Sequence, residues 1–129
     1  LIADERNEIA SVNNGVAEIP LGNFADIYSN CSKEFALKQG IRSMKPDIFV
    51  TDEIDIDNDL QSIIDATNSG VEVLATIHSN NITELKTKRG FDKVLENKVF
   101  DRYIVLSDND GPGTLAHIYD SNLKCVYCK

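Results

Sequence analysis

Short apolar segments alternate with longer amphipathic segments along this chain, which predicts strands and helices in turn. Strands are predicted over residues 1–3, 48–51, 71–75, 103–106, 115–119 and 123–127. Helices are predicted over residues 33–44, 56–67, 82–88 and 91–98. This alternation is typical of an α/β fold with a mostly parallel sheet and helices on both of its faces. The last three strands follow one another without a helix, so we expect an antiparallel meander there.

Local signals refine several of these elements. Ser32 is a predicted N-cap, and Gly70 is a predicted helix stop. The acidic series at 55, 57 and 59 lacks the glycine of a calcium loop, so we expect it to cap the second helix. Residues 48–50 are apolar and partly β-branched, which predicts a strand buried on both faces. The segment through residues 13–22 contains Gly and Asn and predicts a long mobile loop.

Composition narrows the class of protein. The chain has 129 residues, 42% of them hydrophobic, which suits one domain with a core of its own. A formal net charge of −8 disfavours nucleic-acid or anionic-membrane binding, because both need clustered Lys and Arg. No apolar run approaches the roughly 18 residues of a membrane span, so we expect neither a membrane span nor a signal peptide. We expect a soluble cytoplasmic domain, cut from a longer protein because it begins inside a strand without Met.

The cysteines favour a reducing compartment. Three cysteines are too few for the disulfide framework of a secreted protein. Cys125 and Cys128 have a spacing that also occurs in zinc and redox sites. A zinc site needs two further ligands, and a thioredoxin-like motif begins a helix after a strand. We therefore expect a structural or incidental role for this pair.

Two adjacent carboxylates, Asp52 and Glu53, directly follow the predicted strand 48–51. In nucleotide hydrolases the first such acid orients Mg²⁺, usually through water, and the second polarises the attacking water. Thr76 and His78 follow the next strand, and parallel strands end at one edge of a sheet, so both are candidates for contact with a phosphate. Alternatively, the acids solvate a loop or cap the next helix, and the histidine is an ordinary loop residue.

The first predicted strand also ends in acidic residues, namely Asp4, Glu5 and Glu8. They would lie at the same edge as Asp52 and Glu53, or serve only as solvated loop charge. None of the seven glycines belongs to G-x-x-x-x-G-K-[ST], the loop that wraps phosphates. By its own residues, the chain therefore cannot complete an ATP site.

Four segments carry a more specific pattern: residues 2–10 (IADERNEIA), 41–54 (IRSMKPDIFVTDEI), 75–78 (ATIH) and 100–106 (FDRYIVL). In this order and spacing they resemble the stage III sporulation protein AA family, over nearly the whole chain. That family is a branch of the secretion and pilus traffic ATPases, RecA-like motors that act as hexamers. The resemblance implies one domain over residues 1–129, the C-terminal part of a RecA-like P-loop ATPase domain, with the Walker A loop and an N-terminal domain upstream.

The resemblance assigns roles to the acidic residues. Asp4, Glu5 and Glu8 match the acidic box of traffic ATPases, in which Glu8 is expected to reach the water or the magnesium ion. Asp52 and Glu53 match the Walker B motif. Asp52 would then bind Mg²⁺ through water, and Glu53 would polarise the attacking water.

The resemblance also assigns roles to basic residues. His78 matches the histidine box, and Arg42 and Arg102 are candidates for phosphate contact or for charge between subunits. The chain departs from the family where an Arg-Thr-Asp run is replaced by residues 24–26 (FAD). Phe24 cannot donate a hydrogen bond to a phosphate, so this loop lacks the contribution of an arginine.

The implied function is ATP hydrolysis, with ATP and Mg²⁺ as cofactors. It would power assembly or transport through the channel between the two compartments of a sporulating Gram-positive bacterium. The implied partners are further copies in a hexamer and membrane channel proteins of the same assembly. The implied location is the cytoplasm of the mother cell, peripheral at its membrane. This piece alone is expected to be inactive because it lacks the phosphate loop.

Two other functions fit part of the pattern. A phosphorelay receiver domain shares the length, the acidity, the early acids and Thr76. It would need a Lys after its last parallel strand, where this chain has Leu106 and Ser107, and it would end in a helix. A non-catalytic assembly module would use its acids only to solvate the surface.

Overall fold

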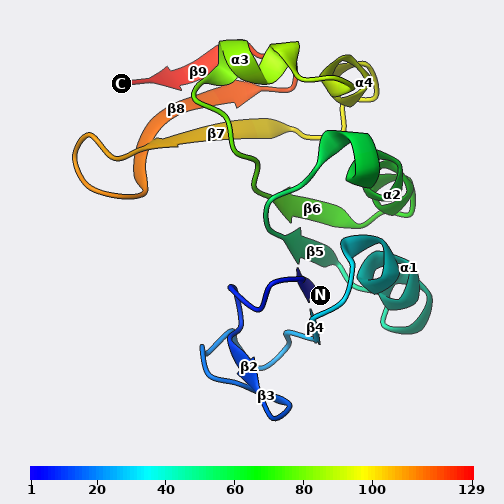
Figure 1. Ribbon diagram of the computed structural model, residues 1–129. Helices are drawn as coiled ribbons and strands as arrows, with labels where there is room; N and C mark the ends of the chain where they lie inside the picture. The colour runs from blue at the N-terminus through cyan, green and yellow to red at the C-terminus, as the bar shows by residue number, and fades with distance from the viewer. The chain divides into compact units, whose positions relative to one another are not determined.

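The computed structural model describes all 129 residues, which divide into two compact units, Leu1–His78 and Ser79–Lys129. Each unit has helices and strands of its own (Figure 1). The first unit contains β1 (Ile2–Asp4), β2 (Val12–Asn13), β3 (Val16–Ala17), β4 (Ile27–Ser29), α1 (Lys33–Ser43), β5 (Ile48–Thr51), α2 (Ile56–Asn68) and β6 (Glu72–Ala75). The second unit contains α3 (Ile82–Thr87), α4 (Phe91–Glu96), β7 (Arg102–Ser107), β8 (Thr114–Asp120) and β9 (Cys125–Cys128).

The first unit is built on a four-stranded sheet in the order β4-β1-β5-β6. All three strand pairs are parallel, with Ile2 opposite both Ile27 and Val50, and Thr51 opposite Ala75. The predicted α/β fold with a parallel sheet is therefore confirmed. Because the strands are parallel, the residues that follow β1, β5 and β6 emerge at one edge, which we call the carboxyl edge.

Helices α1 and α2 contact each other and both pack on the sheet, so they cover the same face (Figure 1). The connections from β4 to β5 and from β5 to β6 cross the sheet in the same direction. Right-handed crossovers that advance in one direction lie on one face. The prediction of helices on both faces is therefore wrong for this unit.

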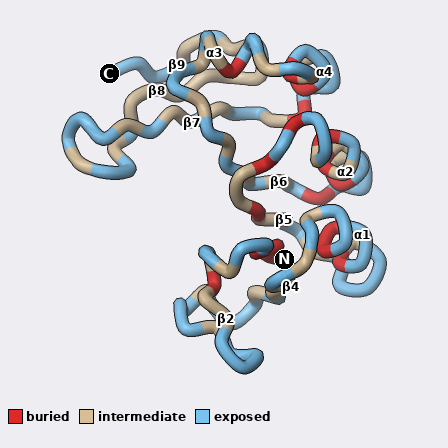
Figure 2. The backbone as a smooth tube through the Cα atoms, in the orientation of Figure 1, coloured by how far each residue is buried: buried red, intermediate tan, exposed pale blue.

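The core of the first unit lies between these helices and the sheet, where Figure 2 shows buried residues gathered. Its buried members are Ala3, Ala36, Leu37, Phe49, Ala66 and Val71. Strand β5 contributes one face only, because Phe49 is 1% exposed whereas its neighbour Ile48 is 52% exposed. The prediction that β5 is buried on both faces is wrong, since an apolar run does not distinguish one buried face from two.

Both long helices begin where the sequence predicts. The Ser32 hydroxyl accepts a hydrogen bond from the Phe35 N–H at the start of α1. The Asp55 carboxylate accepts one from the Asp57 N–H at the start of α2. Asp59 returns the contact, accepting from the Asp55 N–H at 2.9 Å. The acidic series is thus a helix cap, as predicted.

The segment between β1 and β4 is more structured than the predicted loop. It contains the antiparallel hairpin of β2 and β3, turned by Asn14 and Gly15, both at positive φ. Strand β4 then joins the edge of the parallel sheet. These three strands have only two or three residues each, and in this Gly- and Asn-containing segment that is too few alternating positions for the sequence to reveal them. Phe24 lies in this segment and is fully exposed.

The second unit is built on an antiparallel sheet in the order β7-β8-β9, which confirms the predicted meander. Ile104 lies opposite Ile118 in this sheet. The Tyr103 ring contacts the rings of Phe91 in α4 and Phe100, with centroids 5.8 and 6.1 Å apart. These aromatic contacts join α4 to the sheet. Neither these helices nor those of the first unit are long and apolar enough to cross a membrane.

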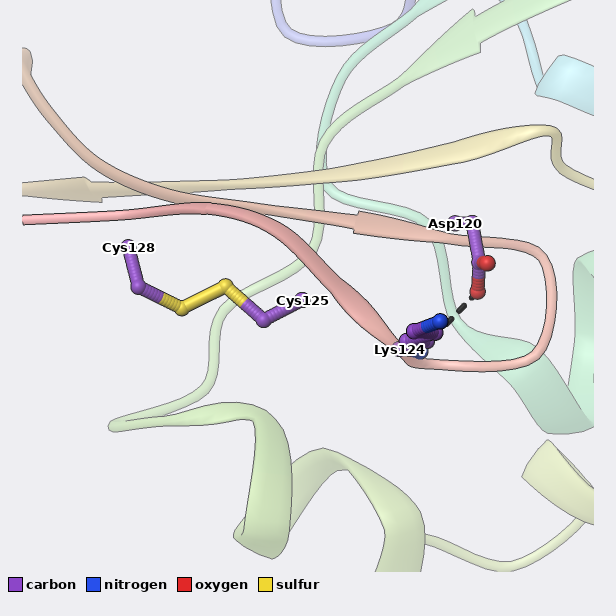
Figure 3. The surroundings of a disulfide bond; sticks show 4 residues. All are labelled: Asp120, Lys124, Cys125 and Cys128. Carbon is purple, nitrogen blue, oxygen red and sulfur yellow. Dashed lines mark hydrogen bonds between the residues drawn. A yellow bond between two sulfur atoms is a disulfide. The ribbon is translucent and has the colours of Figure 1, made fainter.

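Cys125 and Cys128, both in β9, are joined by a disulfide bond (Figure 3). The turn before β9 is held by Asp120, whose carboxylate accepts hydrogen bonds from the N–H groups of Asn122 and Lys124, each at 2.9 Å. The sequence predicts no disulfide and favours a reducing compartment, so this pairing differs from the expectation. Cys31 is a free, half-buried thiol in the first unit.

Candidate functional site

The candidate site lies at the carboxyl edge of the parallel sheet. Arg6 follows β1, Glu53 follows β5 and His78 follows β6. The Glu53 carboxylate contacts both basic residues: Oε2 lies 2.8 Å from Arg6 Nη1, and Oε1 lies 3.8 Å from His78 Nε2. Side chains from three strand ends therefore meet at one carboxylate.

The main chain of Glu53 is held in an uncommon conformation. Its φ of 42° lies in the left-handed region, which residues other than Gly rarely adopt. The Thr76 hydroxyl accepts a hydrogen bond from the Glu53 N–H at 2.9 Å, and the Thr76 carbonyl accepts one from the Ile54 N–H at 2.8 Å. Thr76 was predicted to contact a phosphate, and the structure places its hydroxyl against the main chain of Glu53. Thr76 thus ties the ends of β5 and β6 together.

Asp4 is fully buried at the end of β1. Its carboxylate accepts three main-chain hydrogen bonds, from the N–H groups of Glu8 (2.7 Å), Ile9 (3.1 Å) and Ala10 (2.7 Å). Asp4 therefore fixes the course of the loop after β1 instead of facing solvent. Glu8 is exposed, and its side chain makes no hydrogen bond or ion pair. The structure brings the Glu8 side chain into no contact with Glu53.

Glu5 forms an ion pair with Lys33 at the start of α1, with Oε2 and Nζ 2.8 Å apart. The Lys33 side chain is only 13% exposed. Burial alone would lower the pKa of Lys33, but the hydrogen bond to Glu5 and the charges of Glu5, Asp59 and Asp52 outweigh burial and raise it. Lys33 is thus a permanent cation beside the acids of the carboxyl edge.

Asp52 is the residue best placed to hold a magnesium ion. It is half-buried, and its carboxylate makes no hydrogen bond, so both oxygens are available as ligands. Mg²⁺ usually takes one or two protein carboxylates and completes its shell with water and phosphate oxygens, which this arrangement fits. No group of three or more His, Cys, Asp or Glu side chains is arranged to hold a metal ion.

Arg42 and Arg102 are the two basic residues that the resemblance assigned to phosphate or to charge between subunits. Arg42 is in the last turn of α1, which returns the chain to the start of β5 and hence to the opposite edge of the sheet from Glu53. Arg102 begins β7 in the second unit, where its Nη1 donates a hydrogen bond to the Asp101 carbonyl at 2.7 Å. The structure does not bring Arg42 to the acid pair, so a contact between subunits is the role that stays predicted for it.

Arg6 is a residue of this site that the sequence analysis missed as a candidate. The signal was present, because Arg6 lies two residues beyond the end of β1, among acids already expected at this edge. The candidates at the end of β1 were the acidic residues Asp4, Glu5 and Glu8. A guanidinium that pairs with one of them is equally informative.

The comparisons with known proteins agree with one another. The family model described as Sporulation stage III, protein AA, matches residues 1–126. Stage III sporulation protein AA of Bacillus subtilis (strain 168) is 36% identical over 121 residues, which cover 94% of this chain and 39% of that protein. The chain thus spans about two fifths of the length of this curated relative. No solved structure matches the chain.

Proposed function

The chain belongs to the family described as Sporulation stage III, protein AA, and from this premise we propose that it is part of an ATPase that energises a sporulation channel complex. A role in sporulation follows from the family. The ATPase activity is the step that we add. It is supported by one observation above all: Glu53, directly after a core strand, lies between Arg6 and His78 at the carboxyl edge of the sheet.

In this proposal the residues that follow β5 and β6 have separate roles. Asp52 would hold Mg²⁺ through water, and the ion would neutralise charge on the nucleotide phosphates. Glu53 orients the attacking water and accepts its proton. His78 donates a hydrogen bond toward the developing charge on the phosphate. Thr76 keeps the Glu53 main chain in place through the hydrogen bond to its N–H.

The proposal extends to the whole protein. The fold is a RecA-like core, and the glycine-rich loop that cradles the phosphates belongs to the part of the longer protein that this chain does not contain. Six copies form a ring in the mother cell and act on membrane channel proteins. Glu8 forms no ion pair, and Arg102 belongs to the second unit, so we propose that both act on ligands or neighbouring subunits bound during the cycle.

The test is Glu53→Gln in the full-length protein, with ATP hydrolysis and ATP affinity measured separately. Loss of the proton acceptor should lower the rate of hydrolysis by about 100-fold or more while ATP still binds. Glu72→Gln is the matched control, because Glu72 is exposed at the opposite end of β6. Unchanged turnover in Glu53→Gln would refute the ATPase assignment and favour a non-catalytic assembly module.

A further inference from the structure

Two ion pairs at the carboxyl edge differ in how tightly the protein holds them. Lys33, which pairs with Glu5, is 13% exposed and is surrounded by acidic charge. Arg6, which pairs with Glu53, is 62% exposed, and Glu53 itself is 39% exposed. Exposed ion pairs contribute little net free energy, so the contact between Arg6 and Glu53 is easily exchanged for another.

The position of Arg6 is nevertheless well defined. The loop that carries Arg6 begins at buried Asp4. Three main-chain hydrogen bonds to the Asp4 carboxylate fix residues 8–10, which follow Arg6 in the same loop. The Asn7 side chain adds two hydrogen bonds with the main chain of Val12, at 2.9 and 2.6 Å. The main chain around Arg6 is therefore held, while its long side chain has room to move.

An anionic ligand at this edge needs a mobile cation. Asp52, Glu53 and Glu8 would repel a phosphate, and Lys33 is already paired with Glu5. A guanidinium can bind either a carboxylate or a phosphate, and Arg6 contacts Glu53 through one ion pair, so it can exchange this partner for a phosphate.

We propose that Arg6 is a phosphate-binding residue whose resting partner is Glu53. Without nucleotide, its guanidinium holds the Glu53 carboxylate. When a nucleotide phosphate arrives, Arg6 moves to the phosphate and leaves Glu53 free to face water. This inference rests on the proposed function, since it takes the ligand to be the phosphate chain of ATP.

The exchange makes a specific thermodynamic prediction. If Glu53 competes with the phosphate for Arg6, removing the charge of Glu53 should strengthen ATP binding, and most of this gain should require Arg6.

Calorimetry with ATP on the full-length protein therefore needs four forms: wild type, Glu53→Gln, Arg6→Gln and the double variant. We expect Arg6→Gln to weaken binding about tenfold, as loss of a charge-assisted contact does. We expect Glu53→Gln to strengthen binding up to about fivefold in the wild-type background and much less in Arg6→Gln.

The controls separate this inference from the proposed function. Lys38→Gln removes one positive charge from an exposed site in the middle of α1 and should leave ATP affinity unchanged. Arg6→Lys keeps the charge without the two-pronged geometry and should restore only part of the affinity. An equal effect of Glu53→Gln in both backgrounds would overturn the role of Arg6 while ATP binding by the wild type stands. Absence of ATP binding by the wild type would overturn both.

Discussion

At the scale of single residues, Asp4 shows that an acidic residue at the end of a strand can stabilise the fold without being available to bind a ligand. Sequence resemblance places it in an acidic box, but the structure buries it completely and surrounds it with main-chain donors. A buried carboxylate that accepts three N–H groups is compensated for its lost hydration. Asp4 thereby sets the loop that carries Arg6 and Glu8.

Asp4→Asn should therefore destabilise the chain strongly. The new NH₂ group would oppose main-chain N–H donors, and at least one buried hydrogen bond to a charged acceptor would be lost. We expect a loss of about 3 kcal/mol in the free energy of unfolding, measured by urea denaturation. Asp47→Asn changes the charge equally at an exposed position and should cost less than about 0.5 kcal/mol. Equal losses in the two variants would contradict this role.

The buried hydroxyl of Tyr103 leads us to predict a loss of stability at alkaline pH. Its hydroxyl is buried without a hydrogen-bond partner, and burial raises the pKa of Tyr103 to about 12. The unfolded chain releases this proton near pH 10, so the unfolded state is favoured increasingly as the pH rises from about 10 to about 12. The stabilising contribution is fully present below about pH 10.

Tyr103→Phe should remove this pH dependence, because phenylalanine has no proton to release. It also deletes an unsatisfied buried hydroxyl, so at neutral pH stability should be unchanged or rise by up to about 1 kcal/mol. Urea denaturation of both forms at about pH 8 and about pH 11 measures the difference. A parallel decline of the two forms with pH would assign the alkaline loss to other groups.

At the scale of elements, helix α2 depends on its N-cap. Asp55 accepts hydrogen bonds from the Asp57 N–H at 3.0 Å and from the Asn58 side chain at 2.6 Å. Asp55→Ala should cost about 1 kcal/mol of stability, whereas Asp55→Ser keeps an acceptor and should restore most of it. Thermal unfolding followed by circular dichroism is the measurement. A loss in Asp55→Ser as large as that in Asp55→Ala would show that charge and not capping matters here.

Elements with caps or clear apolar spacing could be predicted from the sequence, whereas the short strands between β1 and α1 could not. Helices α1 and α2, with 11 and 13 residues, have clear caps and apolar spacing. Strands β2, β3 and β4 have only two or three residues each, so they left no pattern. Whether the helices cover one face of the sheet or both depends on the order of the strands, and the pattern of apolar residues does not reveal that order.

The candidate site could be predicted in part, because some of its residues directly follow strands that the sequence reveals. Residues directly after recognised strands, such as Glu53, Thr76 and His78, could be assigned to one edge because parallel strands end together. The contact of Arg6 with Glu53 depends on the turn after β1, and the left-handed conformation of Glu53 depends on Thr76. Such loop geometry is set by tertiary contacts and leaves no periodic signal. Nor does spacing reveal whether two cysteines pair, as Cys125 and Cys128 do.

At the scale of the whole molecule, the chain spans 39% of the length of its Bacillus subtilis relative. It contains proposed hydrolytic residues but no loop to wrap phosphates. We therefore expect the 129-residue chain by itself to show no appreciable ATP binding in calorimetry, and under the proposed function we expect the full-length protein to bind ATP. Micromolar affinity of the isolated chain would mean that the phosphates are held by residues outside such a loop.

The left-handed backbone of Glu53 has a consequence for laboratory evolution. At φ of 42°, a residue with a Cβ costs about 1 kcal/mol relative to glycine, and glycine would keep the N–H that bonds to Thr76. A library randomised at position 53 and sorted only for heat resistance should enrich glycine. The same library sorted for spore formation in living cells should return glutamate. If it does, this position preserves chemistry at the expense of durability.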